Sequence, residues 1–281
     1  MNKILAFGAT GPFAGLVLPE LAQRNAEVRA FVRKSGDVPL VRRNGASEVA
    51  IGDLTDADSV RQALKGITSI FYVSPVFLDN QAAIGQRVVA QAVEAGVRRF
   101  VFSSVIHPVL NGLPNHASKA LVEEAVLDSN LEFTFLHPAI LFQNYERTWR
   151  GIIENGVIIE PWSNETRHSR VDYRDVAKVA AIAITEDRLT NGTFELCAEG
   201  TLNRHEIAAM IGDITGCTIE ARRGGADMLN KFPDLLRPMF EHYDRYGLRG
   251  NALTLRAILG RDPQTLRAYF EELAGKAPCV H

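Results

Sequence analysis

A glycine-rich turn follows the first apolar run of the chain. The segment KILAFGATGPFAG is typical of a strand, a tight turn through Gly8 and Gly11, and the start of a helix. Glycine lets the backbone approach a ligand closely, and a helix that starts there directs its free N–H groups toward an anion. Pro12 fits the first turn of such a helix, where its missing N–H costs nothing. The segment predicts a diphosphate-binding turn, although purely structural strand-to-helix turns also use glycine.

Two cations close the next expected strand, EVRAFVR, which Lys34 follows. In dinucleotide-binding folds the end of this strand contacts the adenosine ribose. A carboxylate there favours the free 2′-hydroxyl, and an arginine accommodates a 2′-phosphate. Arg33 and Lys34 stand there without a carboxylate, so charge complementarity favours NADP(H) over NAD(H). The alternative is a solvated pair of side chains at a strand end.

Asp53 and Leu54 close the third expected strand. A short polar residue beside an apolar one could hold an adenine ring there. Asp53 could instead cap the helix that begins near Asp56.

The elements that must position these residues alternate along the first half of the chain. Strand-like runs are KILAFG, EVRAFVR, EVAIG, SIFYVS, RRFVFSS and EFTFLHP, and helical patterns include residues 11–24, 57–64, 81–95 and 117–127. This rhythm predicts an α/β fold with a Rossmann-type, doubly wound parallel sheet. After Pro138 strands become fewer, which predicts a smaller C-terminal α+β lobe. We place an NAD(P)-binding domain at residues 1–140 and a substrate-binding lobe at 141–281, with residues 165–200 returning in part to the sheet.

Composition excludes several classes of partner. The chain has 281 residues, 46% of them hydrophobic, and a formal net charge of -2, which fits a globular protein without an electrostatic footprint for nucleic acid or an anionic membrane. Its cysteines are Cys197, Cys217 and Cys279, far apart and odd in number, so neither a disulfide framework nor a metal site is expected. No apolar stretch approaches the roughly 20 residues that cross a bilayer. We expect a cytoplasmic protein that is a monomer or homodimer, with no membrane or direct nucleic-acid contact.

Several fragments together carry a resemblance to a known family. They are GATGPFAG, AFVRK, GDLTD, FYVSP, RRFVFSS, HASKALVEEAVLDSNLEFTFLHPAILFQN and VDYRDVA. Their order and spacing resemble the NmrA-like family of atypical short-chain dehydrogenase/reductases over about residues 3–180. One departure is Ala14, which stands where the family usually has its third glycine, and alanine is tolerated there.

The resemblance implies a set of cofactor contacts. The pyrophosphate would be lined by Gly8, Thr10, Gly11, Pro12 and Phe13. The 2′-phosphate would contact Arg33 and Lys34, and the adenine would lie between Asp53 and Leu54. The residues implied to lie along a ribose are Val73, Ser74 and Pro75, and those near the nicotinamide are Pro138, Ala139 and Ile140.

The resemblance also points to a catalytic helix. Reductases of the broader superfamily use a Tyr-x-x-x-Lys pair in which the tyrosine donates the proton. Lys119 occupies the lysine place, but Asn115 stands where the tyrosine would be, and an amide supplies no proton at neutral pH. Lys119 could act as the acid–base group if burial and cationic neighbours lowered its pKa toward neutrality. It could equally bind only the cofactor ribose.

Other polar residues follow the same strands. Ser104 stands where the catalytic hydroxyl of the superfamily would be, or is a capping or turn serine. His107 follows the same strand, at the sheet edge where open α/β folds bind ligands, and could donate a proton; an unreactive loop histidine is the alternative. His116 could cap or line the catalytic helix, and we expect His137 to be packed rather than reactive.

Aromatic residues follow the sixth expected strand. Phe142, Asn144 and Tyr145 could form a substrate pocket over the nicotinamide, with Trp149 and Trp162 contributed by the smaller lobe. Such a pocket would suit a flat carbonyl, quinone or enone. Packing in a core is the alternative role for these rings.

Together these features predict an NADPH-dependent oxidoreductase that passes a hydride to a small apolar carbonyl, quinone or activated double bond. Two alternatives stay open. One is a regulatory protein that binds NAD(P) without turnover and reports to a protein partner, which Asn115 favours. The other is an isomerase or lyase that uses the cofactor only structurally.

Overall fold

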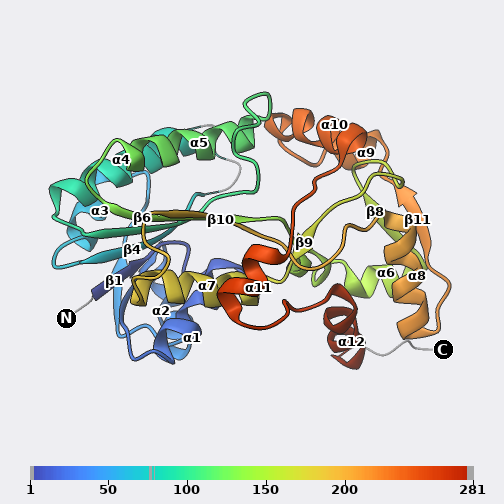
Figure 1. Cartoon of the computed structure of the whole chain (residues 1–281), viewed down its shortest axis with the longest axis horizontal. Coiled ribbons are helices and arrows are strands. Elements are labelled where there is room, and N and C mark those ends of the chain that lie inside the picture. The colour runs from blue at the N-terminus through green and yellow to red at the C-terminus, as the bar shows by residue number, and fades with distance from the viewer. Residues whose placement is uncertain (1–2, 76–77, 79, 277–281) are drawn as a thin grey trace. The chain divides into compact units, whose positions relative to one another are not determined.

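The computed structural model describes residues 3–75, 78 and 80–276, which divide into two compact units (Figure 1). Unit 1 comprises residues 1–111, 116–137 and 176–194. Unit 2 comprises residues 112–115, 138–175 and 195–281. The segment 176–194 of unit 1 lies inside the range 165–200 that was expected to return to the sheet.

A seven-stranded sheet forms the centre of unit 1, in the order β10-β6-β5-β4-β1-β2-β3. Its strands are β1 (Lys3–Ala6), β2 (Glu27–Val32), β3 (Glu48–Ile51), β4 (Ser69–Val73), β5 (Arg99–Ser103), β6 (Glu132–Pro138) and β10 (Gly192–Leu196). Every pairing from β3 through to β6 is parallel. The predicted Rossmann-type α/β fold is confirmed.

Helices cover both faces of this sheet (Figure 1). One face carries α3 (Ala57–Ala63), α4 (Gln81–Glu94) and α5 (Pro114–Leu127), and the other carries α1 (Val17–Ala22), α2 (Val38–Arg43) and α7 (Tyr173–Thr185). Leu5 and Phe7 pack in a core with Val88 of α4 and Val122 of α5. Because both faces are buried, the strands are apolar at consecutive positions, as parallel strands usually are.

Unit 2 contains two short sheets and several helices. The strand β8 (Val157–Glu160) pairs in parallel with β11 (Glu220–Arg223), and β7 (Ile140–Leu141) pairs in parallel with β9 (Arg170–Val171). The helices are α6 (Trp149–Asn155), α8 (Arg204–Thr215), α9 (Ala226–Leu229), α10 (Arg237–Tyr246), α11 (Leu253–Leu259) and α12 (Leu266–Lys276). Asn203 caps α8, and the Glu206 side chain accepts in return from the Asn203 N–H, which fixes where this helix begins.

A buried ion cluster ties the elements of unit 2 together. Glu160 at the end of β8 pairs with Arg170 of β9 at 3.2 Å and with Arg204 of α8 at 3.4 Å. Burial raises the pKa of Glu160, but the charges of the two arginines outweigh it and lower that pKa below its usual value. Removing one partner would leave an uncompensated buried charge, so the cluster holds these elements in one arrangement.

Candidate cofactor-binding and catalytic site

The turn from Gly8 to Phe13 follows β1 where the strand order reverses. In the sheet β1 lies between β2 and β4, and open α/β sheets bind ligands in the crevice at such a switch point. Gly8 has a φ of +74°, and a Cβ there would lie 3.6 Å from the Cβ of Val73, the last residue of β4. The Gly11 N–H donates to the Gly8 carbonyl at 2.8 Å. The turn is therefore tight, and it lies against the strand whose end was expected to line a ribose.

Gly15 makes the close approach that a third glycine usually makes one position earlier. A Cβ on Gly15 would lie 2.9 Å from the carbonyl oxygen of Ala9, whereas Ala14 fits beside Gly8. The first helix also begins later than expected. A 3-10 turn over Ala14–Leu16 precedes α1, so Pro12 lies in the turn and not in the first helical turn. Glycine at positions 8 and 11 permits this tight turn, and diphosphate binding by its backbone stays a prediction.

Arg33 and Lys34 follow β2 directly, and both side chains are exposed. Asp53 follows β3, the neighbouring strand, and its Oδ1 accepts from the N–H and hydroxyl of Thr55 at 2.8 and 2.7 Å. These hydrogen bonds lower the pKa of Asp53, and the nearby charge of Arg33 contributes. The adjacent strand ends thus bring the predicted phosphate and adenine residues together.

The alternative role for Asp53 as a helix cap is wrong. Asp56 caps α3, because its Oδ1 accepts from the Asp58 N–H at 3.0 Å. Leu54 is half-buried against the core of unit 1.

Lys119 is buried on α5 with 5% of its surface exposed. Its Nζ donates to Oε1 of Gln81 at 2.6 Å, and Gln81 is the first residue of α4, the helix after β4. Burial lowers the pKa of Lys119 to about 8. Asn115 lies one turn earlier on the same helix. Burial therefore makes the Lys119 ammonium a stronger acid than that of an exposed lysine.

Ser104 follows β5, and its hydroxyl donates to the carboxylate of Glu123 on α5. The same oxygen, Oε1, lies 2.9 Å from Nε2 of His137 in β6. His137 is packed, as expected, but it has this polar partner. Neither Glu123 nor Gln81 was predicted from the sequence. The four-residue spacing from Lys119 to Glu123, which puts both on one helix face, was the available signal for Glu123.

His107 lies in the loop after β5 with a φ of +53°. Left-handed backbone is uncommon at a residue other than glycine and costs free energy. The ring Nδ1 of His116 lies 3.0 Å from the His107 carbonyl oxygen. Because α5 begins at Pro114 and not at residue 117, His116 is inside the helix, and it is fully buried. His116 thus helps to fix the loop that carries His107.

The residues predicted near the nicotinamide and substrate come later in the chain. Pro138 ends β6, Ala139 donates its N–H to the Leu196 carbonyl at 3.1 Å, and Ile140 begins β7. Their distance from a nicotinamide stays a prediction.

The aromatic residues predicted for the substrate pocket pack in unit 2. The ring of Phe142 lies 5.5 Å from that of Tyr269, and the ring of Tyr145 lies 5.1 Å from that of Phe270. The rings of Trp149 and Trp162 are also buried, and Asn144 is exposed. The structure therefore gives the four rings a packing role, and a substrate contact stays a prediction.

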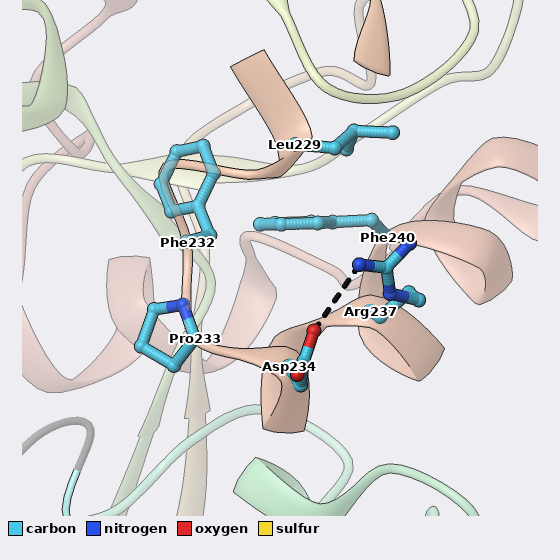
Figure 2. Close-up of a pocket in the computed structure, with 6 residues that line it drawn as sticks. All are labelled: Leu229, Phe232, Pro233, Asp234, Arg237 and Phe240. Carbon is cyan, nitrogen blue, oxygen red and sulfur yellow. Dashed lines mark hydrogen bonds and ion pairs between the residues drawn. The ribbon is translucent and has the colours of Figure 1, made fainter. Parts of the chain in front are cut away.

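Two hollows in the described part of the chain are lined by none of the predicted site residues, although Ser59 in the first is hydrogen-bonded to Asp53. One, of about 400 Å³, is in unit 1 beside β3 and α3 and is lined by Arg29, Ala50, Ile51, Ser59, Gln62, Ala63 and Lys65. The other, in unit 2, lies between Phe232 and Phe240, with the Asp234–Arg237 ion pair at its side (Figure 2). Its volume of about 10 Å³ is that of one water molecule, so it is a packing gap.

Residues 3–75, 78 and 80–276 contain neither a membrane-spanning helix nor a cluster of metal ligands. No helix there has the length and apolar character to cross a membrane. Among those same residues, no cluster of three or more His, Cys, Asp or Glu side chains could hold a metal ion.

Comparison with known sequences decides the family. Residues 1–266 match the NmrA-like family. The chain belongs to the NmrA-like family. One curated relative, the NAD(P)H azoreductase of Xenophilus azovorans, is 28% identical over 278 residues, which cover 95% of this chain and 96% of that protein. The family predicted from the sequence is thus confirmed.

Two solved structures share the fold of the whole chain. The triphenylmethane reductase of Citrobacter sp., complexed with NADP(H), has a TM-score of 0.84 at 21% identity and covers 97% of this chain and 100% of its own. The NADPH-dependent quinone oxidoreductase of Escherichia coli, complexed with NADPH, has a TM-score of 0.84 at 23% identity, with coverages of 97% and 99%. Both are NAD(P)-binding folds of the kind predicted.

Proposed function

We propose that this chain is an NADPH-dependent reductase that transfers a hydride to a small apolar carbonyl, quinone or activated double bond. The observation that carries the proposal is the tight glycine turn after β1, at the switch point between β1 and β4. A Cβ on Gly15 would lie 2.9 Å from the Ala9 carbonyl oxygen, and a Cβ on Gly8 would lie 3.6 Å from the Cβ of Val73. The named relatives, an azoreductase, a dye reductase and a quinone oxidoreductase, support the same class of chemistry.

NADP(H), in preference to NAD(H), is the proposed cofactor. The backbone from Gly8 to Phe13 would hold the diphosphate, and Arg33 and Lys34 would bind the 2′-phosphate. Asp53 and Leu54 would flank the adenine, and Val73, Ser74 and Pro75 would lie along a ribose. When bound, the nicotinamide supplies the hydride.

Reduction of a carbonyl or quinone needs a proton as well as a hydride. The Lys119 ammonium is the proposed donor, since burial brings its pKa to about 8. After it gives its proton to the oxygen that the hydride transfer leaves negative, the neutral amine takes a proton back from solvent.

Ser104 and His107, which follow β5, are the other proposed catalytic side chains, and Pro138, Ala139 and Ile140 would lie near the nicotinamide. We propose Phe142, Asn144 and Tyr145 as substrate contacts, and unit 2 as the substrate-binding part.

The test is consumption of NADPH by the purified chain. The protein is incubated with NADPH and a panel of quinones, aldehydes, enones, azo dyes and triphenylmethane dyes, and the cofactor absorbance is followed. We expect NADPH to be oxidised with at least one class of acceptor. With NADH at the same concentration, the same reaction should be slower. Lack of any NADPH binding by titration would remove the proposal entirely.

A second candidate is a regulatory protein that binds NADP(H) without turnover. The specific observation in its favour is Asn115, which cannot donate a proton at neutral pH where a reductase of the broader superfamily has tyrosine. NADPH binding without oxidation across the panel would favour this candidate, and pull-down with and without NADPH would then search for its protein partner. Substrate turnover without net oxidation of NADPH would indicate an isomerase or lyase.

A further inference from the structure

A single carboxylate oxygen joins two side chains at the carboxyl ends of β5 and β6. Oε1 of Glu123 accepts the hydrogen of the Ser104 hydroxyl and lies 2.9 Å from Nε2 of His137. The Glu123 and His137 side chains are only 12% and 8% exposed. Polar groups this well buried are costly unless they are hydrogen-bonded. Ser104, Glu123 and His137 provide hydrogen-bond partners for one another.

This contact fixes which way the Ser104 hydroxyl points. A serine hydroxyl has one hydrogen and two lone pairs, whereas an ionised carboxylate can only accept. The hydrogen of Ser104 therefore points at Glu123. Any other group that reaches the Ser104 oxygen meets a hydrogen-bond acceptor. Such an oxygen can bind an ammonium, O–H or N–H group, but it cannot donate to a carbonyl.

We propose that Glu123 and His137 are positioning residues that hold Ser104 as a hydrogen-bond acceptor at the edge of the sheet. The proposal deepens the proposed reductase function and depends on it. Since Ser104 has no hydrogen to offer the substrate, the proton must come from another group, and Lys119 is the proposed donor. The hydroxyl formed when a carbonyl oxygen takes its proton can then donate to Ser104, so the site favours acceptors whose reduced form carries an O–H or N–H group.

The position of Glu123 suits this role. It lies four residues after Lys119, so both side chains are on the same face of α5, one turn apart. Lys119 is hydrogen-bonded to Gln81 of α4, and Glu123 is hydrogen-bonded to Ser104 beside β5. The helix thus carries two polar groups with different partners. Lys119 is placed to give a proton. Glu123 accepts the hydrogen of the Ser104 hydroxyl, so that hydroxyl cannot donate to a substrate.

The test is a double-mutant cycle on kcat with the acceptor that the panel identifies. The variants are Ser104→Ala, Glu123→Ala and the pair together. The matched control is Glu124→Ala, the next residue of α5, whose side chain is exposed and which we expect to keep the native kcat. We expect each single change in the cycle to lower kcat roughly 10- to 100-fold, because it frees or removes the Ser104 oxygen. The double variant should lose no more than Ser104→Ala alone, because Glu123 acts only through Ser104.

His137→Leu is the second variant, in case Glu123→Ala lowers folding stability, and its effect on kcat should likewise vanish in the Ser104→Ala background. Thermal unfolding of every variant separates loss of fold from loss of kcat. Two outcomes would overturn the positioning role while leaving the reductase function intact. One is a double variant whose loss of kcat is the product of the two single losses, and the other is a native kcat in Glu123→Ala. No turnover by the native chain would remove both.

Discussion

The chemistry of Lys119 depends on its surroundings more than that of any other proposed catalytic residue. A lysine in water titrates near pKa 10.4 and holds its proton too tightly to be an efficient donor at neutral pH. Burial on α5 brings the pKa of Lys119 to about 8. A group with this pKa is largely protonated near neutral pH and still gives up its proton readily. The loss of the superfamily tyrosine at Asn115 therefore does not remove an acid from the helix.

This pKa predicts how the reaction depends on pH. Only the ammonium form donates, so kcat should be level below neutral pH and should fall about tenfold per unit of pH above about 8. Lys119→Met should lower kcat by roughly 10²- to 10⁴-fold and abolish this fall. The measurement is kcat against pH at saturating NADPH. If Lys119 only binds the ribose, Lys119→Met will instead weaken NADPH binding and leave the shape of the profile unchanged.

Arg33 is the side chain proposed to distinguish NADPH from NADH. Arg33→Ala should weaken NADPH binding by about 1.5–3 kcal/mol, the usual contribution of a hydrogen bond to a charged group, and should barely change NADH binding. Titration of both cofactors measures the difference. The matched control is Arg61→Ala, an exposed arginine of α3 that pairs with Asp58. Equal losses for NADPH and NADH would refute the assignment of Arg33 to the 2′-phosphate.

At the scale of elements, the strands were predictable and the details of the glycine turn were not. Strands buried on both faces are apolar at consecutive positions, so a run such as RRFVFSS identifies β5 from local residues alone. The position of Gly15 against the Ala9 carbonyl depends on how the chain folds back after β1. The resemblance aligned Ala14 with the third glycine of the family, and only the three-dimensional turn shows that Gly15 makes the close approach.

The same turn supplies a prediction for one element. Gly15→Ala would put a methyl group 2.9 Å from the Ala9 carbonyl oxygen, which is backbone and cannot rotate away. The turn must shift, and we expect a loss of roughly 1–3 kcal/mol of stability together with weaker NADPH binding. Thermal unfolding and cofactor titration measure the two effects. Gly36→Ala is the control for stability, since an added Cβ there meets nothing within 4 Å; equal unfolding temperatures for both variants would contradict the clash.

At the scale of the whole molecule, the strands whose ends carry the predicted cofactor residues were easier to predict from the sequence than the polar contacts between different elements. The glycine turn, Arg33 and Lys34 follow from local patterns at the ends of strands. The contacts Lys119–Gln81 and Glu123–His137 join different elements, and they exist only once the sheet and its helices pack. Propensity and periodicity contain no information on such pairs. The same holds for Phe142 and Tyr145, whose spacing fits a pocket wall as well as a core.

Unit 1 depends on a segment far along the sequence from its other parts. Every residue from Val176 to Ile184 except Lys178 is buried. Arg99 of β5, only 2% exposed, donates to the carbonyls of Ala183 and Glu186 and pairs with Asp187. Residues 176–194 thus cover an apolar face and complete the partners of a buried charge.

A fragment of residues 1–140 should therefore not fold, although it contains every predicted phosphate-binding residue. Each buried Val or Ile side chain contributes about 1.5–3 kcal/mol, so the four that α7 supplies between Val176 and Ile184 together match the usual 5–15 kcal/mol stability of a domain. Arg99 would also lose three of its partners. We expect no cooperative thermal unfolding by circular dichroism and no NADPH binding by titration. The control is the full chain, which should show both, and a cooperative transition in the 1–140 fragment would show that α7 is dispensable.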